Sequence, residues 1–234
     1  MKTIKLTPRL LAVASQVKPC DVVADIGTDH GFVPTYLVQK NVCTRAIASD
    51  INKEPLKSAM RTAASHNITD KLEFICAPGL EGIIPGSVDT VVIAGMGGET
   101  IVEILKAAEW VKEHGTMLVL QPQSKLELFE DYLNSNGFSI NGVRLVKDAG
   151  RIYTIFDVQY SGKLIDSNIT YFCEYLKKDP LFLEYADGLL KKLELRKAGL
   201  QSANNTNVEE LENICNTVEY IKSVVLEVKA NGNS

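Results

Sequence analysis

Two aspartates follow two short apolar segments of the chain, at a spacing suited to binding a ribose-containing cofactor. Asp25 directly follows the apolar segment 22–24, and Gly27 comes two residues later. Twenty-five residues after Asp25, the second aspartate, Asp50, follows another apolar segment, 46–49. In folds that bind nucleotide cofactors, a carboxylate after the second strand accepts hydrogen bonds from ribose hydroxyls. We therefore expect Asp50 to bind a ribose and the turn after Asp25 to border the same site.

The acid in front of the first glycine indicates the charge of the cofactor. Dinucleotide-binding loops have the pattern G-x-G-x-x-G, in which the glycines let the backbone approach a pyrophosphate. Here the pattern over 25–31 is D-x-G-x-x-x-G, with Asp29 where the second glycine would lie. Two carboxylates repel a pyrophosphate but attract the sulfonium and ammonium groups of S-adenosylmethionine. The residues thus favour S-adenosylmethionine over NAD, although an aspartate and a glycine also follow strands in α/β domains with neither cofactor.

A second glycine-rich segment, Ala94-Gly95-Met96-Gly97-Gly98, follows an expected strand at 89–93. In a methyltransferase fold this segment lies beside the transferable methyl group. Enzymes that methylate the exocyclic amine of adenine usually have Asn/Asp-Pro-Pro-aromatic there, which this chain lacks. The glycines leave room for a planar substrate to approach, or alternatively they only shape a tight turn from strand to helix.

The elements that must position these residues alternate between strand and helix up to about residue 160. Strands are expected at 22–24, 46–49, 72–75, 89–93 and 116–120, and helices at 55–65, 99–109 and 125–135. Two further strands, 139–146 and 152–158, are separated by a turn too short for a parallel crossover, so they form an antiparallel pair. This order predicts an α/β, Rossmann-like, doubly wound fold with seven strands.

After residue 160 the pattern changes to helices. Asp179-Pro180 predicts the start of a helix that runs to about Leu200, with Phe182, Leu189 and Leu193 on one side.

A second helix begins after a capping box formed by Thr206 and Glu209. Its apolar residues repeat with heptad spacing at Leu211, Ile214, Val218, Ile221, Val225 and Val228. We therefore predict two domains, 1–160 as the cofactor-binding domain and 161–234 as an antiparallel coiled-coil hairpin.

The helical hairpin admits two functions, a lid or dimerisation arm without chemistry, or a surface that recognises a substrate. Its first half contains six cations that are candidates for binding RNA: Lys177, Lys178, Lys191, Lys192, Arg196 and Lys197. The second half contains acids. Because the net charge of the chain is −4, it has no general affinity for nucleic acid, and RNA would have to bind a local patch.

The composition is that of an ordinary folded domain, with 45% hydrophobic and 23% charged residues. No segment approaches the roughly 20 apolar residues that span a membrane. The apolar run 10–14 is shorter than the hydrophobic region of a signal peptide. Thr7 and Pro8 instead predict the start of an amphipathic helix.

The cysteines and histidines indicate neither a metal site nor a disulfide framework. The five cysteines form no C-x-x-C pair, and the three histidines are dispersed, so no zinc site is expected. Cys76 lies in an apolar context and is expected to be a reduced core residue. We expect a cytoplasmic monomer with no metal.

Four motifs together resemble those of the bacterial tRNA adenine-N1 methyltransferases that act on position 22. They are Asp25-Ile26-Gly27-Thr28-Asp29-His30 with Pro34, Ser49-Asp50, Ala94-Gly95-Met96-Gly97-Gly98, and Leu120-Gln121-Pro122-Gln123. The resemblance covers essentially the whole chain. It implies a Rossmann-like methyltransferase domain, S-adenosylmethionine as cofactor, tRNA as substrate, and a hairpin that helps to bind the tRNA.

The resemblance also implies which residues contact the cofactor. They are Asp25, Gly27, Thr28, Asp29, His30, Asp50, Ile51, Asn52, Pro78, Gly79, Ala94, Gly95, Met96 and Gly97. One departure concerns Ala77-Pro78-Gly79-Leu80, because such proteins often have Gly-Asp-Gly-Leu there. The missing acid would engage the adenine amine of the cofactor, so backbone groups would have to replace it, and the affinity for the cofactor could be lower.

Adenine N1 already carries a lone pair, so its methylation needs no strong base. Alignment of the reacting atoms can lower the barrier by about 7–11 kcal/mol in the best cases. Asp29 is a candidate for stabilising the cationic product, with His30 as a hydrogen-bonding partner. Alternatively, Asp29 only binds the methionine ammonium and His30 only caps the following helix.

The target base must leave its paired stem, and Phe32 and Tyr36 are candidates to stack on it.

Three other functions stay open on the residues alone. The first is a methyltransferase that acts on ribosomal RNA or a small molecule, against which the hairpin argues mildly. The second is an NAD(P)-dependent oxidoreductase, which Asp25 and Asp29 disfavour. The third is a non-catalytic RNA-binding protein of the same fold, to which Pro78 gives slight support.

Overall fold

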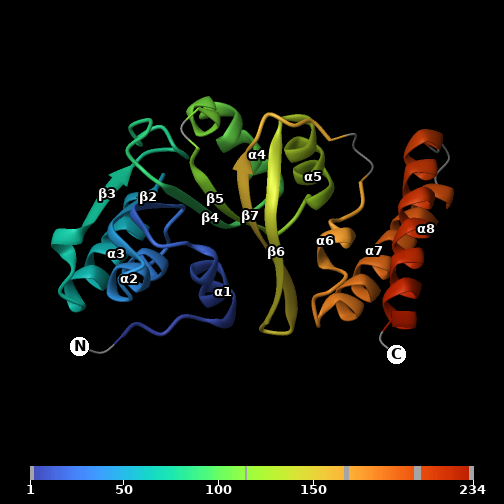
Figure 1. Cartoon of the computed structure of the whole chain (residues 1–234), viewed down its shortest axis with the longest axis horizontal. Coiled ribbons are helices and arrows are strands. Elements are labelled where there is room, and N and C mark those ends of the chain that lie inside the picture. The colour runs from blue at the N-terminus through green and yellow to red at the C-terminus, as the bar shows by residue number, and fades with distance from the viewer. Residues whose placement is uncertain (1–2, 114, 166–168, 203–206, 232–234) are drawn as a thin grey trace. The chain divides into compact units, whose positions relative to one another are not determined.

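A seven-stranded sheet organises the first part of the chain (Figure 1). The strands are β1 (Cys20–Ile26), β2 (Cys43–Asp50), β3 (Leu72–Cys76), β4 (Thr90–Met96), β5 (Met117–Pro122), β6 (Phe138–Asp148) and β7 (Arg151–Tyr160). Their order is β3-β2-β1-β4-β5-β7-β6. Strands β1 to β5 are parallel, whereas β7 pairs antiparallel with β5 and with β6. The predicted fold, including its antiparallel final pair, is confirmed.

The computed structural model describes residues 3–113, 115–165, 169–202 and 207–231. The chain divides into two units, Met1–Ile165 and Asp166–Ser234. Among the described helices, none combines the length and the apolar character needed to cross a membrane.

Helices cover both faces of the sheet in the first unit. Helices α1 (Pro8–Gln16), α2 (Phe32–Gln39) and α3 (Lys53–Ser65) pack together, and α4 (Gly98–Ala107) packs with α5 (Leu126–Ser135). The strand order reverses between β1 and β4, and right-handed crossovers then place the two groups on opposite faces. Because both faces are covered, the middle of each central strand is apolar, and Val23, Val92 and Val119 are almost fully buried.

Two helix boundaries refine the predictions. At the start of α1, Pro8 is the first residue and Thr7 Oγ1 accepts a hydrogen bond from the Leu10 amide at 3.4 Å, as expected. The single helix expected over 99–109 instead ends at Ala107 and is followed by the 3₁₀-helix η2 (Glu109–Lys112). A second 3₁₀-helix, η1 (Thr69–Lys71), precedes β3.

The second unit contains α6 (Cys173–Leu176) and the paired helices α7 (Phe182–Ser202) and α8 (Val208–Asn231). Helix α7 begins two residues after Pro180, and Asp179 Oδ1 accepts a hydrogen bond from the Leu181 amide at 2.9 Å. Thr206 of the expected capping box lies outside the described residues. Asn207 Oδ1 accepts a hydrogen bond from the Glu210 amide at 3.1 Å, so Asn207 caps α8.

The apolar seam of α8 differs from the predicted heptad at one step. Ile214, Val218, Ile221 and Val224 are buried, whereas Val225 is only half-buried. The step after Ile221 is therefore three residues, where the heptad pattern predicted four.

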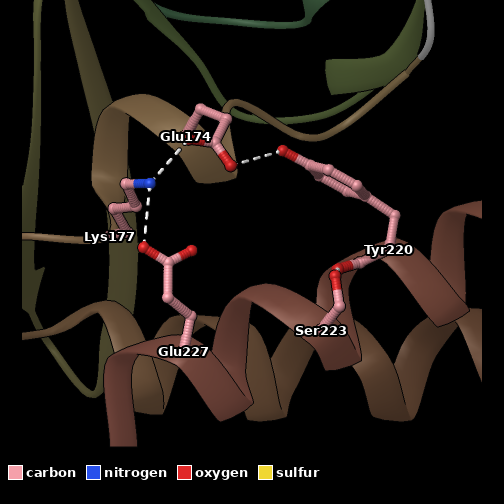
Figure 2. A network of polar contacts seen from close by, with 5 residues as sticks. All are labelled: Glu174, Lys177, Tyr220, Ser223 and Glu227. Carbon is pink, nitrogen blue, oxygen red and sulfur yellow. Dashed lines mark hydrogen bonds and ion pairs between the residues drawn. The ribbon is translucent and has the colours of Figure 1, made fainter. Parts of the chain in front are cut away.

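A polar network connects α6 to α8 (Figure 2). Lys177 Nζ lies 2.9 Å from Glu174 Oε2 and 3.2 Å from Glu227 Oε1. The Tyr220 hydroxyl donates a hydrogen bond to Glu174 Oε1 at 2.9 Å. These contacts lower the pKa of Glu174 and raise that of Lys177. Lys177, a predicted RNA contact, is therefore already bound to two carboxylates.

Candidate active site at the carboxyl ends of the parallel strands

The turn after β1 is attached to the end of β2. Asp25 lies within β1 and is only 7% exposed, and its neighbour Ile26 pairs with Ser49 of β2. The backbone amides of Gly27 and Thr28 both donate hydrogen bonds to the Ser49 carbonyl oxygen, at 2.8 and 2.9 Å. The polypeptide thereby brings the Asp25 and Asp50 carboxylates to one edge of the sheet, as predicted from their spacing.

The buried position of Asp25 alters its ionisation. Burial, with a smaller contribution from the nearby Asp50 carboxylate, raises the pKa of its carboxyl from 3.8 to about 7. The Thr28 side chain partly opposes this shift. A carboxyl with such a pKa is partly protonated at neutral pH and becomes fully ionised when a cation binds beside it.

Asp50 ends β2 with its carboxylate held in place. Its Oδ1 accepts a hydrogen bond from the Asn52 amide at 2.7 Å, and the exposed Ile51 side chain lies between them in the sequence. The Ala77 amide donates to the Asp50 carbonyl oxygen at 3.2 Å, which brings the segment containing Pro78 to the same edge.

Cys76 and Gly79 have structural surroundings that the sequence did not indicate. The expectation that Cys76 is a core residue is wrong, because its side chain is exposed where β3 ends. Gly79 has a φ of +53°, and a Cβ there would lie 3.1 Å from Ile104 of α4. The positive φ and the close approach of Ile104 therefore both favour glycine at position 79.

The glycine-rich segment predicted after the fourth strand is partly the end of that strand. Strand β4 extends to Met96, and its pairing with β5 shifts register between Ala94 and Met96. The residue in between, Gly95, is exposed and has a φ of +87°, which favours glycine. A Cβ on Gly27, whose φ is +74°, would overlap the Met96 Cε methyl. The β1 turn and this bulged end of β4 therefore lie against each other.

Asp29 and His30 pair with each other at the surface. Their Oδ2 and Nε2 atoms are 3.3 Å apart, and the side chains are 79% and 49% exposed. The His30 ring stacks on Phe32, with ring centroids 5.1 Å apart. No side chain caps α2, which has Gly31 at its N-cap with a φ of +65°, so the alternative role of His30 as a helix cap is wrong. Tyr36 is only partly exposed and packs against the core.

The site contains polar groups that are available to a ligand. Ser49 Oγ, next to Asp50, is buried and has no hydrogen-bond partner among the described residues. Two carboxylates, a hydroxyl and an open glycine at the end of β4 fit a cationic ligand with ribose hydroxyls. The described residues contain no cluster of three or more potential metal ligands.

Comparison with known proteins agrees with this geometry. The methyltransferase-domain family matches residues 6–156. The chain belongs to this family. A tRNA (adenine(22)-N(1))-methyltransferase of Bacillus subtilis is 27% identical over 96% of this chain and 99% of its own length. The prediction of a methyltransferase is thus confirmed.

Two solved structures are similar to this methyltransferase over nearly its whole length. TrmK of M. capricolum, in complex with the cofactor product S-adenosyl-homocysteine, is 25% identical, with a TM-score of 0.77, and the match covers 95% of this chain and 98% of that one. A Streptococcus pneumoniae protein in complex with S-adenosyl-L-methionine is 26% identical, with a TM-score of 0.79, and the match covers 94% and 100%.

Arg9 borders the candidate site of this methyltransferase, and no sequence motif indicated it. Its Nη1 donates a hydrogen bond to Gln121 Oε1 at 2.8 Å, and it would lie 3.5 Å from a Cβ on Gly95. Arg9 stands more than eighty residues before Gly95 in the sequence, so only the packing of α1 brings them together.

A hollow of about 730 Å³ lies at the opposite, amino-terminal edge of the methyltransferase sheet, where it is lined by Lys18, Asp21 and Asp89 among others. Asp89 Oδ2 there accepts hydrogen bonds from the Asp21 and Val22 amides at 3.0 and 2.8 Å. This carboxylate therefore stabilises the start of β1, on the far side of the sheet from Asp25 and Asp50.

The predicted RNA-binding cations of the methyltransferase fall into two groups. Besides Lys177, Lys191 pairs with Asp187 at 2.7 Å and Arg196 with Glu210 at 2.7 Å. For Lys178, Lys192 and Lys197, the described part of the chain shows no ion pair.

Proposed function

We propose that this methyltransferase transfers the methyl group of S-adenosylmethionine to N1 of the adenine at position 22 of tRNA. The observation that carries the proposal is the pair of carboxylates, Asp25 and Asp50, beside the open end of β4. This negative edge suits a sulfonium cofactor and repels the pyrophosphate of NAD. The name of the Bacillus subtilis relative, which matches over 96% of this chain, supports the substrate and the position.

The residues at the strand ends have distinct roles toward the cofactor. Asp50 accepts hydrogen bonds from the ribose hydroxyls, with Ile51 and Asn52 beside it. Asp25, with Gly27 and Thr28, faces the positively charged methionine part, and its carboxyl ionises there. Backbone groups near Pro78 and Gly79 bind the adenine. When bound, S-adenosylmethionine supplies an electrophilic methyl group.

The substrate side of the site comprises the β4 end and the exposed pair Asp29 and His30. The exposed backbone of Gly95, with Ala94, Met96 and Gly97, lets the planar base approach. N1 has a lone pair, so this chain needs to remove no proton before the transfer. Asp29 stabilises the positive charge that develops on the base, and the stacked rings of His30 and Phe32 offer it an aromatic surface.

The helical hairpin binds the tRNA backbone in this proposal. Its phosphate contacts come chiefly from Lys178, Lys192 and Lys197, because the other three cations, Lys177, Lys191 and Arg196, already have carboxylate partners.

The chain works as a monomer in the cytoplasm, where tRNA is modified and the cysteines of the protein stay reduced. Light scattering of the purified protein tests the monomer.

Methyl transfer to defined transcripts tests the function. Purified protein is incubated with methyl-labelled S-adenosylmethionine and with tRNA transcripts that carry adenine or guanine at position 22. We expect label only in the adenine transcript, at N1 of that base. Equal labelling of both transcripts would refute the position, and labelling of neither would refute the tRNA activity.

The cofactor assignment has its own test in calorimetry. Asp50→Asn removes a charged acceptor of ribose hydroxyls and should weaken binding of S-adenosylmethionine by about 10- to 100-fold, the equivalent of about 1.5–3 kcal/mol. Asp89→Asn, at the opposite edge of the sheet, is the matched control and should leave the affinity unchanged. Equal affinities of the Asp50 variant and the wild type would contradict the assignment.

A further inference from the structure

Arg9 reaches from the first helix to the end of β5 and is held there by a buried amide. Its Nη1 donates a hydrogen bond to Gln121 Oε1 at 2.8 Å. Gln121 is fully buried, and its Nε2 donates to the Pro122 carbonyl oxygen at 2.9 Å. Since this second bond fixes the orientation of the amide, Oε1 points toward the guanidinium. Tyr153 of β7 adds a cation–π contact, with Arg9 Cζ 5.6 Å from its ring centroid.

The Arg9 guanidinium has N–H donors that no carboxylate among the described residues engages. Asp148, the last residue of β6, accepts a hydrogen bond from the Arg9 backbone amide at 3.1 Å and so stabilises the start of α1. Within the described ranges, no carboxylate forms an ion pair with the Arg9 side chain. A guanidinium has five N–H donors, and Gln121 takes one of them. Arg9 differs in this from the paired cations Lys177 and Arg196.

The position of this charge limits what it can bind. Nη1 would lie 3.5 Å from a Cβ on Gly95, so the guanidinium borders the bulged end of β4. Methylation at N1 makes adenine cationic, and an arginine against the ring would oppose that charge. The partner must therefore be an anion that accompanies the base, and the anions of a tRNA are its phosphates.

We propose, on the basis of the function proposed above, that Arg9 binds a phosphate of the tRNA backbone beside the target adenine, and that Gln121 and Tyr153 orient it. A planar guanidinium can bind two phosphate oxygens at once, which fixes the direction of the bound strand as well as its position. The contact would hold the extruded nucleotide over Gly95.

Binding and kinetics of Arg9→Gln and Arg9→Lys test the proposal in the full-length protein. Arg9→Gln should raise KM for the adenine-22 transcript at least about 10-fold and reduce the slope of log Kd against log salt by about one phosphate contact. Arg9→Lys keeps the charge but loses the planar fork, so its salt slope should match the wild type while KM rises several-fold. Affinity for S-adenosylmethionine and the thermal midpoint should stay unchanged in both variants.

Arg144→Gln is the matched control, because Arg144 Nη1 bonds to Ser15 Oγ at 3.1 Å and contacts the same helix about 9 Å further along. It should leave KM and the salt slope unchanged. The proposal is overturned if Arg9→Gln retains the wild-type salt slope and KM, or if its loss of tRNA affinity comes only with lost cofactor affinity or folding. If Arg9→Gln does not fold, the KM of folded Arg9→Lys tests the proposal instead. A several-fold increase supports the proposal, and a wild-type KM overturns it. Failure of the wild-type protein to methylate the transcript would instead refute the proposed function, independently of the salt slopes.

Discussion

Asp25, which faces the cofactor in the proposed function, is a buried residue whose ionisation is costly to the folded protein. Its carboxyl is enclosed at the end of β1 near a second carboxylate, Asp50, and both effects disfavour ionisation. The position therefore makes the empty site electrostatically unfavourable at neutral pH. A cation bound there relieves the repulsion, which is why a group with such a shifted pKa marks a functional site.

The stability of the protein should reveal this shift through its pH dependence. The folded pKa of Asp25, about 7, lies above 3.8, so the folded state holds a proton that the unfolded state has released. The bound proton contributes at most about 4 kcal/mol to the free energy of unfolding. This contribution is complete below pH 3.8 and is lost as the pH rises through 7. Asp25→Asn cannot ionise and should therefore gain stability relative to the wild type between pH 4 and 8.

Urea denaturation of both proteins at pH 4.5, 6 and 8 measures the difference. Asp21→Asn, an aspartate at the start of the same strand, serves as the control and should show no such trend. A stability difference between Asp25→Asn and the wild type that does not change with pH would contradict the raised pKa.

At the scale of elements, the contact between α4 and the segment after β5 depends on one glycine. The Gly98 amide donates to the Ser124 carbonyl oxygen at 2.8 Å, and a Cβ on Gly98 would lie 2.6 Å from the Lys125 carbonyl oxygen. A backbone atom cannot move aside as a side chain can. This close approach sets the start of α4 directly after the glycine-rich segment.

Gly98→Ala should therefore destabilise the protein by about 1–3 kcal/mol. Gly97→Ala is the matched control, because the nearest atom to its Cβ is the Ser124 Oγ at 3.1 Å, and that side chain can rotate. Gly97→Ala should lower the free energy of unfolding by less than about 1 kcal/mol. Chemical denaturation compares the two, and equal losses would contradict the difference in packing.

The hairpin depends on its apolar seam more than on its polar network. Ile221 is fully buried between the helices, so Ile221→Ala should destabilise the second unit by about 2–5 kcal/mol. Lys177→Met removes the ion pairs of Figure 2, which are partly exposed, and should cause no measurable loss. Thermal denaturation followed by circular dichroism distinguishes them. A larger effect of Lys177→Met would make the polar network the dominant contribution.

At the scale of the whole molecule, every predicted cofactor contact lies in the unit Met1–Ile165, and the predicted RNA-binding cations lie in Asp166–Ser234. A fragment of residues 1–165 should therefore fold and bind S-adenosylmethionine within about threefold of the full chain. Its affinity for tRNA should fall at least about tenfold, because the hairpin cations are absent.

Calorimetry with the cofactor and filter binding with a tRNA transcript measure the two affinities of this fragment and of the full chain. An unfolded fragment would show that the first unit requires the second. A fragment with undiminished affinity for tRNA would refute the role of the hairpin and leave recognition to the first unit.

Much of this architecture was predictable because local patterns determine it. Apolar runs of strand length alternate with helical periods, and the short turn near Ala149 requires an antiparallel pair. The aspartate before Gly27 and the spacing to Asp50 indicated the charge and the ribose contact of the site. Boundaries were less certain: β4 extends further than expected, and α8 buries Val224 in place of Val225.

The sequence by itself determined the family, the succession of strands and helices along the chain, and the acids at the strand ends. These features follow from residues that are close to one another in the chain. Only the tertiary structure decided the exposure of Cys76, the close approach of Met96 to Gly27, and the ion pairs of Lys191 and Arg196. It also decided that Arg9 lies at Gly95. Such contacts join residues far apart in the chain, and their geometry follows from how helices pack on the sheet, which no local pattern specifies.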